Sequence, residues 1–251
     1  MQKNIVYQTD QLAHYFTQNR ISWPQFYESE REIISRLNLG HSHAVLDIGC
    51  GCAGLGLALK DQFGVEKYTG VEINSLAAES ARKMNASAQI LCGDFLDLRR
   101  KILLDKRFDV VFSLSCFDWN IQFSNMLSAA WEHVLPGGAL VATFRLVTGE
   151  GCNDIKRSYQ YISFDGVMDG ECAAYVVLNA NDLMHKLIDL NPSDISAFGY
   201  FGAPSSTAVT PYEKLCFSAF SITKRKEGDQ APVGFNLNLP EEIKVSLEPL
   251  A

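Results

Sequence analysis

The sequence lacks a long apolar segment. It contains no stretch of 18 or more apolar residues, whereas a helix that spans a bilayer needs about 20 of them. Residues 1–4 lead into polar sequence without the apolar core of a signal peptide. These absences predict a protein without membrane insertion, and we expect it in the cytoplasm.

Basic residues are also scarce. Lysine and arginine number 22 against 29 aspartates and glutamates, which gives a formal net charge of -7. The longest basic run is residues 224–226. Because contacts with nucleic-acid phosphates usually need a basic face, this balance argues against a nucleic-acid partner.

The seven cysteines follow no pairing pattern. Their number is odd, and their spacings match neither a disulfide framework nor a C-x2-C zinc site. We therefore expect reduced and mostly buried thiols. Clustered histidines or carboxylates are missing too, so the sequence predicts no metal site.

Short apolar runs alternate with amphipathic helical patterns from residue 44 onward. The apolar runs cover residues 44–48, 68–73, 88–92, 108–114 and 139–146. Apolar strands of this length, separated by helices, predict a parallel sheet that is covered on both faces. With two later strands, at 195–201 and 215–223, the expected fold is α/β: a doubly wound, Rossmann-like, seven-stranded sheet with helices on both faces.

Segments outside this core are expected to form smaller additions. Residues 1–40 have the pattern of two helices, the second starting at Ser22 with Gln25 completing a capping box. The predicted organisation is a helical cap over 1–40, a main domain over 41–226 that carries a cap or loop insertion over 147–173, and a tail over 227–251. Within this polar tail only residues 235–239 alternate as an edge strand does.

The strongest functional signal is residues 45–56, which read VLDIGCGCAGLG. A strand enters a glycine turn there and a helix follows at once, so that a ligand can rest against the backbone. The glycine spacing also fits the dinucleotide fingerprint. Asp47 argues against a dinucleotide, because its carboxylate would repel a pyrophosphate. The same carboxylate suits a ligand with an ammonium and a sulfonium. The predicted cofactor is S-adenosyl-L-methionine.

The motif D-x-G-x-G after an apolar strand is similar to motif I of class I methyltransferases. Further landmarks follow in the order of that family: Glu72 after the second strand, Gly93-Asp94-Phe95 after the third, Asp109 early in the fourth, and residues 135–138 before the fifth. The resemblance covers residues 44–146 and implies methyl transfer from S-adenosylmethionine. The chain also resembles bacterial methyltransferases that modify sugars and surface polysaccharides, through residues 23–30, 112–120, 158–161 and 208–212.

The resemblance implies a set of cofactor contacts. Glu72 would accept hydrogen bonds from both ribose hydroxyls, and Asp94 would meet the adenine amino group beside Phe95. Taken singly, Glu72 could be a solvated strand end and Asp94 an ordinary turn residue. The whole expected set is Asp47, Gly49, Cys50, Gly51, Glu72, Ile73, Asp94, Phe95 and Ser113. Asp109 is expected to satisfy local backbone groups instead.

The methyl acceptor is expected beyond the fourth strand, at the carboxyl edge of the sheet. The candidate acceptor contacts are Ser115, Trp119, Asn120 and Tyr159, with Tyr161 and Arg145 as weaker ones. Asp118 is the candidate general base or orienting group, with a capping or solvent-facing role as the alternative. Residues 113–120 lack the Asp/Asn-Pro-Pro-Tyr/Phe sequence of adenine and glutamine amino-group methylases, which counts against methylation of a nucleobase amino group.

Aromatic residues before the core have two possible roles. Trp23, Phe26 and Tyr27 could close over the cofactor, since an electron-rich ring attracts a sulfonium. They could equally fix the N-terminal helices to the sheet.

The predicted function is methyl transfer to a small hydroxylated acceptor, such as a sugar or polysaccharide precursor. Another small metabolite as acceptor, or a cofactor-binding pseudoenzyme that serves as a partner subunit, are the alternatives. A nicotinamide oxidoreductase would share the glycine turn, but Asp47 disfavours it and no Tyr-x-x-x-Lys pair stands where a short-chain reductase needs one. The sequence leaves the oligomeric state open.

Overall fold

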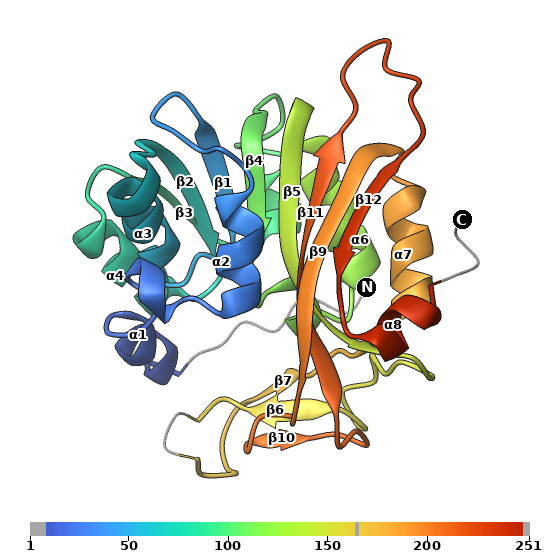
Figure 1. Ribbon diagram of the computed structural model, residues 1–251. Helices are drawn as coiled ribbons and strands as arrows, with labels where there is room; N and C mark the ends of the chain where they lie inside the picture. Colours follow the sequence, from blue (N-terminus) through green and yellow to red (C-terminus); the bar gives the residue numbers. More distant parts are fainter. Residues whose placement is uncertain (1–8, 164–165, 248–251) are drawn as a thin grey trace.

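The computed structural model describes residues 9–163 and 166–247. Its main sheet has nine strands in the order β12-β9-β11-β5-β4-β1-β2-β3, with β8 beside β5 (Figure 1). The strands are β1 Ala44–Ile48, β2 Lys67–Glu72, β3 Gln89–Cys92, β4 Phe108–Ser113, β5 Val134–Val147, β8 Leu178–Asn179, β9 Pro192–Gly202, β11 Leu215–Lys224 and β12 Gly234–Asn238. The longer helices are α2 Glu28–Ser35, α3 Gly54–Phe63, α4 Ser75–Met84, α6 Phe123–Glu132 and α7 Ala180–Ile188. Shorter ones are α1 Gln11–Phe16, η1 Trp23–Gln25, α5 Phe95–Leu98, η2 Phe117–Trp119 and α8 Glu241–Val245.

The order of the strands confirms the expected doubly wound α/β fold. Strands β3, β2, β1, β4 and β5 are parallel to their neighbours, whereas β11 is antiparallel to both β5 and β9. Strands β8 and β12 are additional to the seven that the sequence predicted. The carboxyl ends of β1, β2, β4 and β5 therefore meet at one edge of the sheet, which is where open α/β sheets bind ligands.

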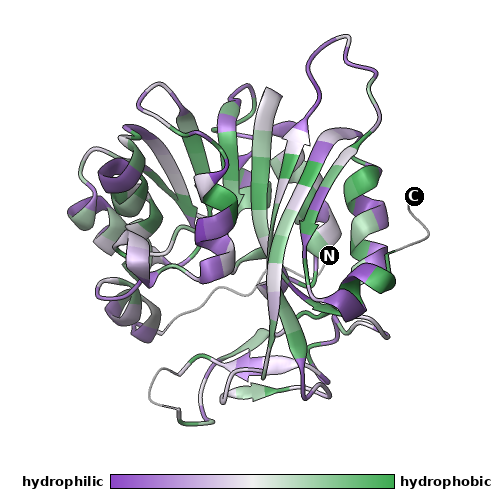
Figure 2. Ribbon diagram, in the orientation of Figure 1, coloured by the Kyte–Doolittle hydropathy of each residue, from purple (hydrophilic) through white to green (hydrophobic). Residues whose placement is uncertain are grey.

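Alternate residues of each central strand enter two different cores. Val45 and Val110 pack with helices α2, α3 and α4. Their neighbours Leu46 and Val111 pack with α6, α7 and α8 on the other face. Figure 2 shows the apolar colouring concentrated in the central strands and on the inner sides of the helices. This period of two, with both faces covered, explains why the strands read as continuous apolar runs.

A smaller three-stranded sheet forms a cap below the carboxyl edge (Figure 1). Strands β6 Tyr159–Tyr161 and β7 Cys172–Ala174 come from the region that the sequence predicted as a cap or loop. The third strand, β10 Ala208–Val209, comes from the connection between β9 and β11, and it pairs with β6. Two segments distant in sequence thus build the cap.

The second N-terminal helix is divided, which corrects the single helix expected from Ser22. The Gln25 side chain accepts hydrogen bonds from the backbone of Ile21 and Ser22, at 2.9 and 3.1 Å, and closes a short 3-10 turn. Helix α2 then starts after Tyr27, whose N–H donates to Glu30 Oε2 at 2.9 Å. Each capping box satisfies backbone donors of its own short helix.

Residues 227–247 complete the fold, in contrast to the expected tail. Strand β12 runs parallel to β9 and contains the residues whose alternation resembles that of an edge strand. Leu239, Ile243 and Leu247 are all buried in the main core. Ile243 lies in α8, and the other two residues flank this helix. Their spacing of four residues is that of an apolar stripe on one side of a helix. The end of the predicted tail, 248–251, lies outside the described residues.

The helices of the described ranges all fall short of the length and hydropathy that crossing a membrane requires. All seven cysteines are free. Within residues 9–163 and 166–247, no group of three or more histidine, cysteine or acidic side chains could hold a metal ion. Asp109 Oδ2 accepts a hydrogen bond from Ala44 N at 2.7 Å, in agreement with its expected local role.

Candidate functional site

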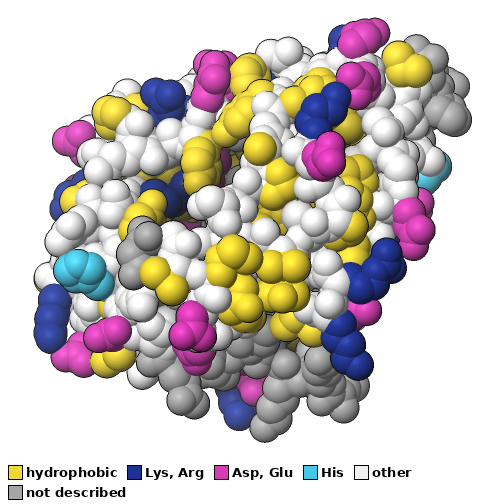
Figure 3. All heavy atoms as spheres, turned by 90° about the horizontal axis from the view of Figure 1, so that it is seen from below, with side chains coloured by type: hydrophobic (Ala, Val, Ile, Leu, Met, Phe, Trp, Pro, Cys, Tyr) yellow, Lys and Arg dark blue, Asp and Glu magenta, His cyan; other side chains and the backbone are white. Residues whose placement is uncertain are grey.

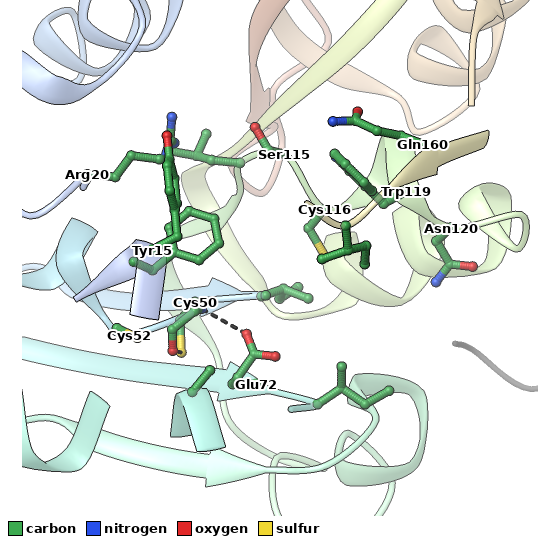
Figure 4. A pocket seen from close by; sticks show the side chains of 18 of the residues that line it. Tyr15, Arg20, Cys50, Cys52, Glu72, Ser115, Cys116, Trp119, Asn120 and Gln160 are labelled. Carbon is green, nitrogen blue, oxygen red and sulfur yellow. Dashed lines mark hydrogen bonds between the residues drawn. The ribbon is translucent and has the colours of Figure 1, made fainter. Parts of the chain in front are cut away.

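A cavity of about 590 Å³ lies between the carboxyl edge of the sheet, the N-terminal segment and the cap. Its volume is in the range of ligand pockets. Glu72, Cys50 and Arg20 lie on one side of it, and Trp119, Asn120 and Gln160 on the other (Figure 4). The cavity therefore has two halves, the first at the ends of β1 and β2 and the second under the cap.

The glycine turn brings the backbone into contact with other parts of the chain. Gly49 and Gly51 have positive φ angles of 77° and 54°, which favour glycine. A Cβ on Gly49 would lie 2.6 Å from Cys116 Sγ. A Cβ on Gly54 would lie 2.0 Å from the carbonyl oxygen of Arg20. The missing side chain of Gly54 thus makes room for the N-terminal segment, a role different from the ligand approach that the fingerprint implied.

Arg20 is a lining residue that the sequence analysis missed. Its Nη2 forms an ion pair with Glu30 Oε1 at 2.8 Å. The guanidinium lies over the rings of Phe26 and Tyr27, with centroid distances of 4.7 and 5.1 Å. Its Nη1 is buried and has no hydrogen-bond partner in the part of the chain that the structure describes. A buried donor without a partner is costly, so this atom calls for an anionic or carbonyl oxygen in the cavity.

Asp47 lies at the end of β1 and lines the cavity. The Tyr68 hydroxyl donates to its Oδ2 at 2.5 Å. Burial raises the pKa of Asp47 to about 7, against the opposing effects of the Tyr68 hydrogen bond and the charge of Arg20. A cationic group placed beside this carboxylate would favour its ionised form.

Glu72 lies at the end of β2, on the same side of the cavity. Its Oε2 accepts a hydrogen bond from Gly51 N and its Oε1 from Asn74 N, both at 2.8 Å. Burial raises the pKa of Glu72, and hydrogen bonds from the backbone oppose the shift. An ionised carboxylate has about four acceptor positions, so both oxygens keep the capacity to bind a ligand hydroxyl.

The first half of the cavity also contains Ile73 and Phe95, together with Gly93. Asp94 is absent from the described lining residues, and its carboxylate caps α5 by accepting from Leu96 N at 2.8 Å. Ser113 is fully buried within β4 and is likewise absent from the wall. The structure therefore brings together Asp47, Gly49, Cys50, Gly51, Glu72, Ile73 and Phe95 from the predicted cofactor set, without Asp94 and Ser113.

The second half begins with the segment after β4. Ser115, Trp119 and Asn120 line the cavity as the sequence predicted, together with Cys116. Ser115 has a φ of 50°, and its N–H donates to Thr143 Oγ1 at 2.6 Å. This sharp turn directs the chain from the strand end across the cavity between its two halves (Figure 4).

Asp118, the predicted base, lies behind the wall instead of facing the cavity. Only 4% of it is exposed, and its Oδ2 lies 3.4 Å from Arg145 Nη2. Arg145 Nη1 also donates to the Asp118 carbonyl oxygen at 2.7 Å, and the guanidinium lies 3.7 Å from the ring centroid of Tyr175. Burial raises the pKa of Asp118, and the charge of Arg145 opposes the shift. The pair fixes residues 115–120 against β5 and the cap.

The cap supplies the remaining wall. Gln160, Tyr161, Ser205 and Thr207 line the cavity, whereas the predicted Tyr159 is absent from the described lining. Gln160 Nε2 donates to both Ser205 Oγ and Thr207 Oγ1 at 3.0 Å. These hydrogen bonds join the two sequence segments of the cap at the cavity surface.

Of the three aromatic residues before the core that the sequence analysis named, two reach the cavity, and Tyr15 and Phe16 line it as well. Phe26 and Tyr27 line it and lie beside Arg20. Trp23 packs edge-on against Phe63, with a centroid distance of 5.1 Å, and fixes the N-terminal region to α3.

Comparison with known proteins identifies the part of the chain that contains the glycine turn after β1. Residues 45–138 match the family model for a methyltransferase domain. The chain carries an S-adenosylmethionine-dependent methyltransferase domain. This finding confirms the resemblance to class I methyltransferases that the sequence motifs showed, and S-adenosylmethionine as the cofactor of the domain.

Curated relatives of the methyltransferase domain cover only part of the chain. A malonyl-[acyl-carrier protein] O-methyltransferase of Priestia megaterium is 26% identical over 100 residues, which are 39% of this chain and 35% of that protein. An uncharacterised methyltransferase of Schizosaccharomyces pombe is 30% identical over 89 residues, 36% of this chain and 33% of its own length. The chain thus spans about a third of the length of these relatives.

Solved structures share the fold of the methyltransferase domain over a longer range. Phosphoethanolamine N-methyltransferase 2 of Haemonchus contortus, in complex with S-adenosyl-L-methionine, has a TM-score of 0.55 at 14% identity, covering 80% of this chain and 53% of that one. The N-terminal domain of EvdMO1, with S-adenosylhomocysteine bound, has a TM-score of 0.56 at 12% identity, covering 79% and 82%. At these identities the likeness concerns the fold alone.

Proposed function

We propose that the protein transfers a methyl group from S-adenosylmethionine to a hydroxyl group of a small acceptor, such as a sugar or polysaccharide precursor. The observation that carries this proposal is the division of one cavity into a half with charged side chains and a half whose described lining has none. Arg20, Asp47 and Glu72 line the first half, and the hydroxyl and amide groups of the cap line the second. The cofactor needs the first kind of surface and a hydroxylated acceptor needs the second.

The charged half fits the polar groups of S-adenosylmethionine. The unpartnered Arg20 Nη1 suits its carboxylate, and Asp47 suits its ammonium. The free acceptor positions of Glu72 suit the two ribose hydroxyls. Ile73 and Phe95 would flank the adenine ring. We leave Asp94 and Ser113 out of this assignment, because neither lines the cavity.

Positioning is the main task of the chain in this reaction. When bound, the cofactor supplies a methyl group on a positively charged sulfur. Transfer to an acceptor hydroxyl would leave S-adenosylhomocysteine as the second product and would release the hydroxyl proton to water. Residues 115–120 run from Ser115 to Trp119 and Asn120 in the second half (Figure 4), and they would hold the oxygen in line with the methyl group. Asp118 takes no part as a base, because it lies behind the wall.

Calorimetry with S-adenosylmethionine and S-adenosylhomocysteine tests the cofactor half. We expect micromolar binding of both, and no comparable binding of NAD(H) or NADP(H). Transfer of labelled methyl groups to a panel of hydroxylated acceptors then tests the reaction. Tighter binding of a nicotinamide cofactor would support an oxidoreductase, and binding without transfer to any acceptor would support a pseudoenzyme.

Glu72→Ala is expected to weaken binding of S-adenosylhomocysteine by about tenfold or more, because hydrogen bonds to a charged group contribute about 1.5 to 3 kcal/mol each. Glu79→Ala is the matched control, since Glu79 lies on the exposed side of α4 and forms an ion pair with Lys83. Calorimetric titration of both variants measures the effect. Equal affinity in the two variants would remove Glu72 from the cofactor site.

Gly54→Ala is expected to weaken cofactor binding by about tenfold or more, because the new Cβ would displace Arg20 and its charge-assisted hydrogen bond. The clash is with a backbone oxygen at 2.0 Å, so side-chain rotation offers no relief. Gly40→Ala is the control, because its Cβ would meet only His43 Nδ1, at 4.0 Å. If Gly54→Ala binds as tightly as Gly40→Ala, the N-terminal segment plays no part in holding the cofactor.

A further inference from the structure

The cap half of the cavity has no charged side chain among the described lining residues. The polar side chains that the described part of the cap contributes to the wall are Gln160, Tyr161, Ser163, Ser205, Ser206 and Thr207. None of them carries a charge at neutral pH. The acidic and basic side chains of the described wall are Arg20, Asp47 and Glu72, and all three belong to the cofactor half.

An anionic acceptor would find no cation under the cap within the described ranges. Arg20 is paired with Glu30, and in the proposed function its remaining donor serves the cofactor. Arg145 lies close by in the fold but is buried and bonded to Asp118. A phosphate or carboxylate would lose its hydration there without gaining a partner, and this desolvation is costly. Asp47 and Glu72 in the same cavity would add repulsion.

Hydroxyl groups of an acceptor could both donate hydrogen bonds to the cap wall and accept them from it. A hydroxyl donates one hydrogen bond and accepts two, and the serine, threonine and amide groups of the cap do both as well. Trp119 Nε1 is buried without a hydrogen-bond partner among the described residues, although the side chain lines the cavity. This donor requires an oxygen acceptor. Hydrophobic side chains gather near the middle of the face seen from below, with acidic and basic side chains around them (Figure 3).

We propose that the acceptor is an uncharged polyhydroxylated molecule of the glycoside class, bound under the cap by Gln160, Thr207 and Trp119. This inference rests on the proposed function, and it narrows the acceptor to molecules without phosphate or carboxylate at the cap. Gln160 bridges the two segments of the cap and presents its amide at the cavity surface (Figure 4). The same wall disfavours sugar phosphates.

Matched probes test the charge of the acceptor. The full-length protein, saturated with S-adenosylhomocysteine, is titrated with the methyl glycosides of galactose, fucose and rhamnose and with the corresponding sugar 1-phosphates. We expect at least one methyl glycoside to bind. The affinity for the corresponding 1-phosphate should be lower by about tenfold or more. Equal or tighter binding of the phosphate would overturn the proposal.

Variants of the cap locate the binding. Gln160→Ala and Thr207→Val should weaken the glycoside about fivefold or more and leave the affinity for S-adenosylhomocysteine unchanged. Gln89→Ala is the matched control, because Gln89 is the exposed first residue of β3. Ser206→Lys adds a cation to the exposed rim of the same wall and should strengthen binding of the sugar 1-phosphate. Glycoside binding that the two cap variants leave unchanged would overturn the assignment.

Failure of this inference differs from failure of the proposed function. A protein that binds S-adenosylhomocysteine but no methyl glycoside would overturn the acceptor class alone. A folded protein that binds neither would overturn the cofactor assignment.

Discussion

Arg145→Met is expected to lower the free energy of unfolding by about 3 to 5 kcal/mol, the usual effect of removing one partner from a buried ion pair. Asp118 would remain buried, with only 4% of its surface exposed, and would lose its countercharge. Two backbone carbonyls, of Asp118 and Val176, would also lose the donor that now lies 2.7 and 3.4 Å away. Urea unfolding at neutral pH measures this difference.

A second substitution distinguishes the buried charge from the lost volume. Asp118→Asn in the Arg145→Met background removes the unpaired charge, so we expect it to recover part of the stability. Arg107→Met is the control, because this exposed arginine donates only to the backbone carbonyls of Leu104 and Lys106, and its effect should stay within about 0.5 kcal/mol. If Arg145→Met is as stable as Arg107→Met, the pair does not hold residues 115–120 in place.

Asp47→Asn is expected to change cofactor affinity and stability in opposite directions. Affinity should fall about tenfold or more, because a neutral amide replaces the carboxylate proposed to face the cofactor ammonium. Stability above about pH 7 should rise by roughly 2 to 4 kcal/mol, because burial raises the pKa of Asp47 to about 7 and the ionised form is unfavourable in the folded apoprotein. The asparagine oxygen can still accept the hydrogen bond from Tyr68.

The pH dependence of this stability difference follows from the direction of the shift. Below about pH 4 the carboxyl group is protonated in both the folded and the unfolded state, so wild type and variant should be nearly equal. As the pH rises toward 7, the unfolded chain ionises first and the wild type loses stability relative to the variant. Urea unfolding of both proteins from about pH 4 to 8 measures the gap. A gap that stays constant with pH would contradict the raised pKa.

The first half of the cavity could be predicted because its signals are local. A buried strand, a glycine turn and a helix follow one another within residues 44–63, and a second acid ends the next strand of the sheet. The carboxyl ends of parallel strands lie at one edge of the sheet, independently of the length and conformation of the loops. Asp47 and Glu72 were therefore placed correctly at the cavity from their positions in the pattern.

Neighbouring acids were harder to place, because a position near a strand end does not fix the direction of a side chain. Asp94 satisfies the N-terminus of α5, which begins at the next residue. Asp118 turns toward Arg145, which is 27 residues away and whose partners no local pattern reveals. Asp94 thus caps a helix and Asp118 forms an ion pair, and neither role follows from a position near a strand end.

Arg20 and the polar wall of the cap had no detectable signal. Arg20 reaches the cavity because its segment packs on Gly54, a contact between distant positions. Gln160 meets Thr207 because β6 pairs with the very short strand β10. Strands of two or three residues have no measurable period. The burial of α8 had a signal, the four-residue spacing of Leu239, Ile243 and Leu247, which the surrounding polar residues obscured.

The way in which β9 and β11 continue toward the cap limits how the protein can move. Their ladder is hydrogen-bonded from Asp194 opposite Thr223 to Gly202 opposite Leu215, and β10 lies in the short connection that follows. A lid needs a hinge of a few residues that can change their backbone angles. Here the cap is joined to two strands, β9 and β11, that are hydrogen-bonded to each other along their length. Ligands should therefore exchange through local movements of side chains and loops, on faster timescales than a domain rotation. We therefore expect both halves of the cavity to be formed before either ligand binds.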